Sequence, residues 1–512
     1  MRTPGFLLST LALTALLCSC NSVTGVEDLV FEGQTGSGSG TGTENAYTGT
    51  LSVPGIVIQD AQGVSISQIA LYQGVKAKLM ENGVDAANTV AIVANRDAWM
   101  RVFLAVDPAK YDGKQVIARL TIDGVKDPIE QLVTPNPTPS EEAIPSTVNF
   151  DIPAAMMRPG FAYRVELLQG TDIMLPNNPG SHYPAEDQFA PTNAADIGKS
   201  LKIVLVPFKY GADGSNRLPD TSQKMLDGYR DEFRAMYPAP DVELTLHEPV
   251  QYNKDVDPGG FGWDQLLGYL GNIRSQDQAA FDVYYYGIFS PASNLGSYCG
   301  GGCVAGLGNI AGVGDAYSRA AIGLGMSDDG GATAWETAVH EIGHTHGRQH
   351  APCGGAAGVD PQFPYKGAKL GAWGYNQLTK KLFNPDTTTD VMGYCLPIWA
   401  SDYTWNALSE RIKAVNGFGA KIIVPPDLMN LTYDRARIDA DGELHWMDPV
   451  TIDFPPQNEP MDITVETPQG PQTIKGHFYG YDHLPGGVVL WPQAGGPSKG
   501  VSFEWHGKVL SL

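Results

Sequence analysis

The stretch HEIGHTHGRQH, which begins at His340, sets three histidines, a glutamate and a glycine at fixed intervals. His340 and His344 are close to one helical turn apart, so on an α-helix their imidazoles share one face. Two neutral imidazoles on one face can hold a zinc ion, and Glu341 beside them can take a proton from a zinc-bound water. Gly347 can adopt a positive φ at no steric cost, so it ends the helix and turns the chain until His350 can reach the metal as a third ligand.

The helix is predicted to start near Thr333, because Thr333 and Glu336 match a capping box. A helical wheel places His346 on the side of Ile342, away from the ligand histidines. This predicts that His346 is a buried, hydrogen-bonded structural residue and not a ligand. The motif therefore predicts one zinc ion per chain. A histidine-rich helix end without metal is the alternative, but among ten histidines and 60 glycines chance recurrence of the extended motif is below roughly one in a thousand.

The extended motif resembles that of the metzincin clan of zinc endopeptidases. The clan has a methionine in a tight turn beneath the metal, and DVMGYC, which contains Met392, matches this turn. In the astacin and serralysin branches a tyrosine two places later approaches the zinc. The resemblance therefore assigns Tyr394 to stabilising the oxyanion, with a packed aromatic ring as the alternative. Ala351 stands where those branches carry Glu or Pro, and HGRQHAPCGG is more similar to bacterial secreted and lipoprotein metzincins, loosely the mucin-cleaving ones.

The same resemblance implies a pairing for the four cysteines outside the N-terminal segment. Cys353 follows the third ligand by three residues, and Cys395 follows the turn methionine by three. The resemblance implies that both segments converge under the zinc. We therefore predict a bridge between Cys353 and Cys395, which leaves Cys299 to pair with Cys303. Four free thiols or additional metal ligands are the alternative, and an exported protein disfavours them.

The N-terminus, MRTPGFLLSTLALTALLCSC, is typical of a bacterial export signal. Its apolar run from Phe6 to Leu17 is too short to span a bilayer as a stable helix. Cys20 follows the small residue Ser19, as in a lipobox, so we predict that Cys20 is lipidated and attaches the protein to a membrane. Asn21, where an Asp would favour the inner membrane, indicates the outer membrane or the cell surface. An ordinary cleaved signal is the alternative.

Short β-prone runs separated by Gly, Pro and Asp, such as TVAIVA and WMRVFLAV, predict an immunoglobulin-like β-sandwich. Further along, strand-like runs (LKIVLVPF, DVELTLHEPV, DVYYYGIF) alternate with helix-like ones (SQKMLDGYRDEFRAMY, WDQLLGYLGNI), which indicates an α/β domain. Later runs such as GVVLW predict a small C-terminal β-domain. The predicted order is a lipoprotein signal peptide (1–20), a flexible linker (21–50), the β-sandwich (51–173), a connector (174–198), the zinc domain (199–418) and the C-terminal β-domain (419–512).

Three further features of the sequence bear on binding of nucleic acid, substrate and calcium. A net charge of −22 with no run of Lys or Arg argues against nucleic acid. The Gly-rich run from Leu295 to Gly314 occupies the place of the clan's edge strand, which can pair with an extended substrate, but a plain loop is equally compatible. A turn at Asp439 and Asp441 weakly suggests calcium, although the remaining calcium ligands are missing.

The sequence thus predicts a multidomain protein whose α/β, metzincin-like catalytic domain is flanked by two β-domains. The predicted function is that of a monomeric, zinc-dependent endopeptidase acting on extracellular proteins or glycoproteins, with Glu341 as the general base. One alternative is a surface lipoprotein that binds host or neighbouring glycoproteins and uses zinc only structurally. Another is a zinc amidase of the cell wall. The intact Glu341 favours catalysis, because a purely structural zinc site has no need of it.

Overall fold

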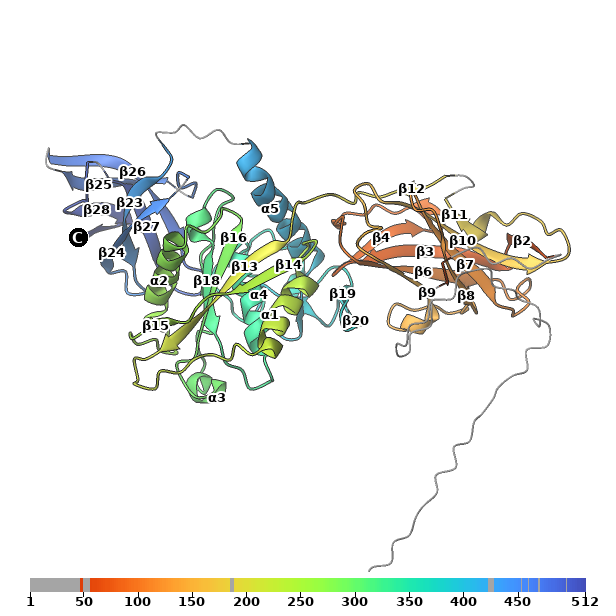
Figure 1. Cartoon of the computed structure of the whole chain (residues 1–512), viewed down its shortest axis with the longest axis horizontal. Coiled ribbons are helices and arrows are strands. Elements are labelled where there is room, and N and C mark those ends of the chain that lie inside the picture. The colour runs from red at the N-terminus through yellow and green to blue at the C-terminus, as the bar shows by residue number, and fades with distance from the viewer. Residues whose placement is uncertain are drawn as a thin grey trace, which may run out of the picture.

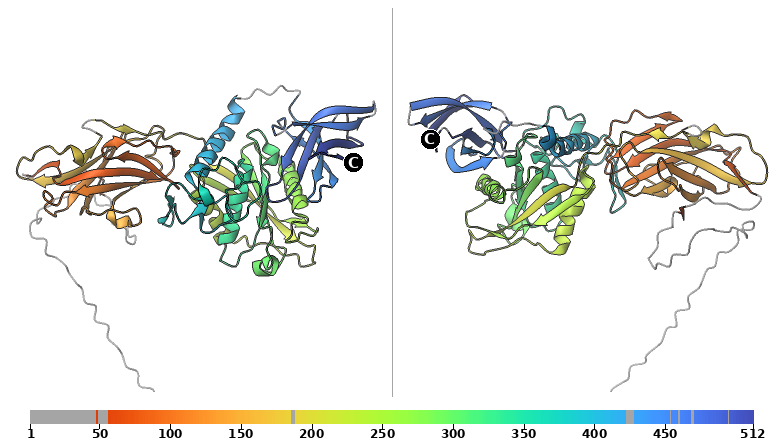
Figure 2. Two further views of the ribbon diagram at one scale, coloured as in Figure 1. Left: turned by 180° about the vertical axis from the view of Figure 1, so that it is seen from behind. Right: turned by 45° about the horizontal axis from the view of Figure 1, so that its top comes forward.

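The structure, a computed structural model, describes residues 47–48, 56–184, 188–421, 428–452, 454–458, 460–467, 470–493 and 495–512. The predicted signal peptide and the lipidation site Cys20 lie outside these residues. Figures 1 and 2 show three parts in a row, namely N-terminal sheets in orange, a central sheet with helices, and a C-terminal sheet in blue. Within the described ranges, no helix combines the length and the apolar character that crossing a membrane requires.

The N-terminal part consists of two antiparallel sheets that share one hydrophobic core. Met100 and Val102 of one sheet and Leu120 of the other are buried in it. One sheet has the order β5 (Val84–Asp85), β4 (Lys76–Glu81), β3 (Val64–Tyr72), β6 (Ala98–Val106) and β9 (Val148–Ile152). The other has the order β1 (Tyr47–Thr48), β8 (Ile129–Val133), β7 (Val116–Ile122), β10 (Ala162–Thr171) and β11 (His182–Tyr183), while β2 (Val57–Asp60) and β12 (Ala190–Pro191) also pair with β10.

The segment TVAIVA, predicted as a strand, belongs to no strand of the described structure. A single parallel bridge between Val93 and Ala195, together with side chains from elsewhere, satisfies its backbone instead. The side-chain amide of Gln73 bonds both the N–H and the carbonyl of Val93, each at 2.8 Å. The indole of Trp405 donates to the carbonyl of Ala91 at 2.9 Å. Because buried backbone groups need partners but not a particular kind of partner, these contacts replace a neighbouring strand.

The central part is built on a sheet of six strands that are parallel except for the edge strand β17. DVELTLHEPV, predicted as one strand, forms two, because Pro249 lacks an N–H and interrupts the pairing. The sheet has the order β14 (Val242–Leu246), β13 (Leu201–Tyr210), β16 (Val283–Phe289), β18 (Ala320–Leu324) and β17 (Gly306–Gly308), and β15 (Val250–Tyr252) also pairs with β13.

Helices cover both faces of this sheet. Helices α1 (Gln223–Met236) and α4 (Ala332–Thr345) pack on one face and α2 (Trp263–Gln276) on the other. Side chains alternate along β16 accordingly, since Tyr284 and Tyr286 share the core of α1 and α4 while Tyr285 shares that of α2. The other helices are α3 (Leu295–Cys299), α5 (Asp402–Lys421) and 3₁₀ turns at Ile144–Ser146, Pro179–Ser181, Ala316–Ser318 and Lys366–Ala368.

The start of α4 differs from the predicted capping box, which does not form. The helix begins at Ala332, one residue before the predicted Thr333. The carboxylate of Asp329 accepts the backbone N–H of Thr333 at 2.9 Å and its hydroxyl at 2.6 Å. Thr333 thus lies inside the first turn and not at the N-cap position that a capping box requires, and Asp329, one turn upstream, accepts its N–H. Glu336 instead lines a cleft.

The C-terminal sheet of seven antiparallel strands packs against α2 (Figure 1), and Val450, Tyr479 and Leu490 share its core. Its order is β24 (Leu444–Ile452), β23 (Leu431–Ile438), β27 (Gly487–Pro492), β26 (Gly470–Gly480), β25 (Pro460–Thr467), β28 (Val501–Trp505) and β29 (Lys508–Ser511). Two small sheets lie between α4 and α5, formed by β19 (Gly374–Asn376) with β20 (Lys381–Phe383) and by β21 (Thr389–Asp390) with β22 (Ile398–Trp399).

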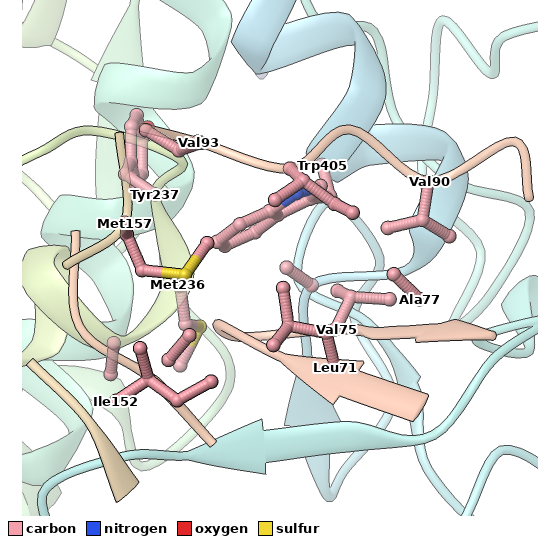
Figure 3. Close-up of a cluster of buried hydrophobic side chains, with 14 of the residues drawn as sticks. Leu71, Val75, Ala77, Val90, Val93, Ile152, Met157, Met236, Tyr237 and Trp405 are labelled. Atoms are coloured by element: carbon pink, nitrogen blue, oxygen red, sulfur yellow. The ribbon is translucent and has the colours of Figure 1, made fainter. Parts of the chain in front are cut away.

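The N-terminal sheets and the central part share buried side chains. In Figure 3, Trp405 of α5 lies among Val75, Val90 and Val93 of the N-terminal part and Met236 of α1. All five are less than a tenth exposed. The apolar core therefore continues from the N-terminal sheets to the helices that carry the histidine motif.

Candidate metal centre

Helix α4 and the loop after it bring the three histidines of the motif together. His340 and His344 are buried on α4, with Glu341 beside them. Gly347, just after the helix, has a φ of +79°, which is the left-handed conformation expected at a helix stop. The chain then turns, so that the ring centroid of His350 lies 4.7 Å from that of His344 and 5.4 Å from that of His340.

The three imidazoles are held by one kind of contact, an Nδ1–H donated to a backbone carbonyl. The acceptors are the carbonyls of Val391 for His340 at 2.7 Å, Arg348 for His344 at 2.7 Å and Ala357 for His350 at 2.5 Å. These bonds assign the proton of each neutral ring to Nδ1 and leave Nε2 as an acceptor. Metal-binding histidines are oriented in this way by their outer contacts.

The free Nε2 atoms converge in a buried space. Those of His340 and His344 are 3.0 Å apart, so two lone pairs face each other. Burial lowers the pKa of His340 well below its usual range and that of His344 to about 3, and it also lowers the pKa of His350. Protonation therefore supplies no positive charge to these rings at neutral pH. Neutral imidazoles that converge on one point are a donor set of the zinc type, and the cluster could hold a metal ion.

The turn predicted beneath the metal lies next to the motif. The N–H of Gly393 donates to the carbonyl of Asp390 at 2.9 Å, and the carboxylate of Asp390 accepts the N–H of Met392 at 2.8 Å. The carbonyl of Met392 accepts the N–H of Ala351, beside the third histidine, at 2.9 Å. Gly343 of α4 lies so close to this turn that a Cβ on it would come within 2.6 Å of the sulfur of Met392.

Disulfides join the same segments. Cys353 is bonded to Cys395 and Cys299 to Cys303, so both predicted pairings are confirmed. The first bridge connects the loop of the third histidine to the methionine turn, with 5.8 Å between the Cα atoms. It therefore restrains the loop that carries His350 relative to the turn that contains Met392.

Tyr394 reaches the cluster from the end of this turn. Its hydroxyl bonds Nε2 of His350 at 3.0 Å and also contacts a ring nitrogen of His483. The side chain is 42% exposed, so this tyrosine is not enclosed in a core. It lines a cleft of about 570 Å³ that gives access to the cluster, together with His340, Glu341 and Glu336.

Two residues of the C-terminal part, absent from the predicted site, enter the cluster. Asp482 and His483 lie in the turn between β26 and β27. Nε2 of His483 lies 2.9 Å from Oε1 of Glu341, and Oδ2 of Asp482 lies 3.0 Å from Nε2 of His344. In the sequence, these two residues could have been suspected as site residues because a carboxylate stands next to an imidazole in YDHLPGG. The signal is weak, because nothing local connects this sequence to a helix so far upstream.

Burial and neighbouring charges oppose each other in this group. Burial raises the pKa of Glu341 well above its ordinary range. Burial opposes charge on Asp482 as well, but His483 and His344 outweigh it and lower the pKa of Asp482. For His483, burial is outweighed by the charges of Asp482 and Glu341, which raise its pKa to about 9.

Unpaired carboxylate oxygens provide a test of whether a cation fits. Oε2 of Glu341 and Oδ2 of Asp482 are buried and find no hydrogen-bond partner among the described residues. Because His344 carries its proton on Nδ1, its Nε2 and the facing oxygen of Asp482 are both acceptors. Opposed acceptors in a buried space cost free energy unless positive charge lies near them. A protonated His483, whose Nε2 lies 3.3 Å from Oδ2 of Asp482, supplies such charge. A metal ion bound by the imidazoles would supply it as well, and the residues fit such an ion with the carboxylates behind its ligands.

The fourth histidine of the stretch HEIGHTHGRQH, His346, faces away from the cluster as predicted. It is 1% exposed, and its Nδ1 donates to the carbonyl of Ile342 at 2.9 Å. Its ring stacks on Tyr284 at a centroid distance of 4.3 Å and meets the edge of Tyr237. The prediction of a buried structural residue is confirmed.

The turn considered for calcium uses its oxygens internally. Oδ1 of Asp439 accepts the backbone N–H groups of Asp441 and Glu443 at 3.1 and 2.8 Å, and Oδ2 faces the imidazole of His445 at 2.6 Å. These contacts are those of a hydrogen-bonded turn, and they add no ligand to the calcium prediction.

No family model matches the chain, and no curated protein matches it. Among solved structures, one described as the structure of a chaperone–substrate complex is similar over 53% of this chain, at 12% identity and a TM-score of 0.25. The chain spans 39% of that structure's own chain.

Proposed function

We propose that the chain is a zinc-dependent endopeptidase that hydrolyses peptide bonds of extracellular proteins or glycoproteins. The observation that carries the proposal is the position of Glu341, a buried carboxylate next to three converging imidazoles and open to the cleft. Structural zinc sites are closed by their ligands and need no adjacent base. We further propose a monomer at the outer membrane or cell surface, and the N-terminal sequence supports its lipidation at Cys20.

The chemistry follows from the residues present. Zinc, held by Nε2 of His340, His344 and His350, would supply a Lewis acid for the scissile carbonyl. Glu341 takes a proton from the attacking water and delivers it to the leaving amine nitrogen. The hydroxyl of Tyr394 lies 3.0 Å from Nε2 of His350, and we propose that it donates a hydrogen bond to the oxyanion.

The proposal is tested by Glu341→Gln, which keeps the shape of the side chain and removes the base. We expect the variant to keep its metal and to lose peptide hydrolysis by roughly 100-fold or more, the usual contribution of a positioned general base. Metal content is measured on the purified protein, and hydrolysis on casein and a peptide library with and without chelator. Glu410→Gln on the exposed side of α5 is the matched control and keeps full activity. Full activity of Glu341→Gln would disprove the mechanism.

A further inference from the structure

Four imidazoles surround one point in the centre, although the sequence motif contains only three of them. The ring centroid of His483 lies 4.9 Å from that of His350, 5.4 Å from His340 and 5.6 Å from His344. The three motif histidines are separated by 4.7 to 5.4 Å. Zinc–nitrogen bonds of about 2.0 Å, with each ring centroid roughly 1.2 Å further out, give separations of about 5 Å for four imidazoles arranged as a tetrahedron. The observed separations agree with this arrangement.

Distances between individual atoms favour His483 over Asp482 as a further metal ligand. One ring nitrogen from each of the four histidines lies within 4.8 Å of the others. Among the three motif histidines Asp482 approaches His344, and its Oδ1 is occupied by the N–H of Gly308 at 3.0 Å. Nε2 of His483 is 2.9 Å from Oε1 of Glu341, and its Nδ1 contacts the hydroxyl of Tyr394, so a metal would bind Nδ1 in place of this hydroxyl. A carboxylate behind a ligand imidazole is the usual outer contact of a metal centre.

We propose that His483 is a fourth ligand of the metal, so that the turn between β26 and β27 closes the centre. Catalytic zinc sites keep one position open, whereas four protein ligands fill the coordination shell. The contact of His483 with Glu341 also engages the general base. The four-histidine form is therefore a resting state, and hydrolysis requires this turn to withdraw. The resting-state role rests on the proposed peptidase function, while metal ligation by His483 does not.

The same turn also covers the edge where a substrate would pair. Strand β17 is the edge of the central sheet, the position predicted for binding an extended substrate backbone. Tyr481 forms an antiparallel bridge with Asn309, directly after β17. Asp482 accepts the N–H of Gly308 within that strand. The turn between β26 and β27 would thus fill the fourth coordination position of the metal. It also contacts Glu341 and bonds backbone groups of β17.

Ligation is tested by metal affinity, measured by competition with a chelator on the whole chain. We expect His483→Ala and His483→Gln to bind Zn²⁺ at least roughly tenfold more weakly, because losing even an outer contact of a ligand costs this much. His477→Ala is the matched control, since it removes an imidazole from β26 whose Nδ1 bonds the carbonyl of Asn458. Its affinity stays that of the wild type. Wild-type affinity in both His483 variants would overturn the proposal.

Closure is tested with Co²⁺ in place of Zn²⁺ and azide as a probe for an open coordination position. We expect azide to change the visible spectrum of the cobalt form of His483→Ala and to leave that of the wild type unchanged. A wild-type spectrum that responds to azide as the variant does would overturn the proposal. At saturating Zn²⁺ we expect His483→Ala to hydrolyse peptides faster than the wild type. If neither protein hydrolyses peptides, the proposed function fails, while the affinity and azide results still decide the ligation.

Discussion

At the scale of single residues, Glu232 on α1 is a carboxylate whose surroundings oppose its charge. Burial, and then the nearby charge of Glu336, raise the pKa of Glu232 from an ordinary value of 4.5 to about 7. Folding therefore favours the protonated form. The free energy of unfolding is unaffected by this group below about pH 4.5 and falls as the pH rises towards 7, because the unfolded chain releases the proton first.

Glu232→Gln removes this cost, so we expect the variant to be more stable than the wild type at pH 8 by roughly 1 to 3 kcal/mol and equally stable at pH 4. Denaturant unfolding at both pH values measures the difference. Glu410→Gln, an exposed acid on α5, is the control, and its effect is the same at both pH values. A gain for Glu232→Gln that does not depend on pH would contradict the assignment.

The sequence identified site residues where neighbours along the chain determine position. His340, Glu341 and His344 lie on one helix and His346 follows its last residue, so the helical repeat was enough to separate the converging histidines from the structural one. His483 was missed because its place in the centre depends on how a distant sheet docks. No periodicity within β26 or β27 carries that information.

At the scale of elements, helices α1 and α4 pack closely where Gly228 meets the ring of Trp335. A Cβ on Gly228 of α1 would lie 2.1 Å from the ring of Trp335 on α4. We expect Gly228→Ala to destabilise the protein by roughly 1 to 3 kcal/mol, because overpacking a rigid ring outweighs the better helix propensity of alanine. Gly417→Ala in α5 is the matched control, since no described atom lies within 4 Å of the added Cβ. We expect it to stabilise by up to about 1 kcal/mol. Thermal unfolding measures both, and a stabilised Gly228→Ala would refute the packing argument.

Elements with a strong repeat were predicted well. The four apolar residues of SQKMLDGYRDEFRAMY that are spaced for a helix are all buried in α1. Predictions failed where side chains competed for backbone groups. Asp329 replaced the capping box of α4, and Gln73, Trp405 and a single backbone bridge to Ala195 replaced a full strand partner for TVAIVA. Such contacts come from residues outside the segment, so its own composition does not indicate them.

At the scale of the whole molecule, one arginine joins the N-terminal sheets to α1. The guanidinium of Arg96 is buried and donates to the carbonyls of Gln73 at 2.8 Å, Tyr237 at 3.0 Å and Ala239 at 2.6 Å. Tyr237 and Ala239 follow the end of α1, so the bonds link two parts of the chain. With Trp405 in the same core, they favour unfolding of both parts in a single transition.

We expect Arg96→Ala to cost at least about 3 kcal/mol, since several buried carbonyls lose a charged donor. We also expect calorimetry to show two transitions in place of one, because the link between the parts is broken. Arg158→Ala, on the exposed surface of the same sheets, leaves the wild-type transition unchanged. An Arg96→Ala variant with a single, unshifted transition would show that the parts are joined in another way.

The docking of the C-terminal sheet has a consequence for the order in which the centre is completed during synthesis. Chains are made from the N-terminus at roughly 5 to 20 residues per second, so the motif histidines exist on the order of ten seconds before His483. A nascent chain can therefore assemble its three-histidine cluster first and acquire the covering turn last. If the turn closes the centre, every newly made molecule passes through a stage in which Glu341 is uncovered.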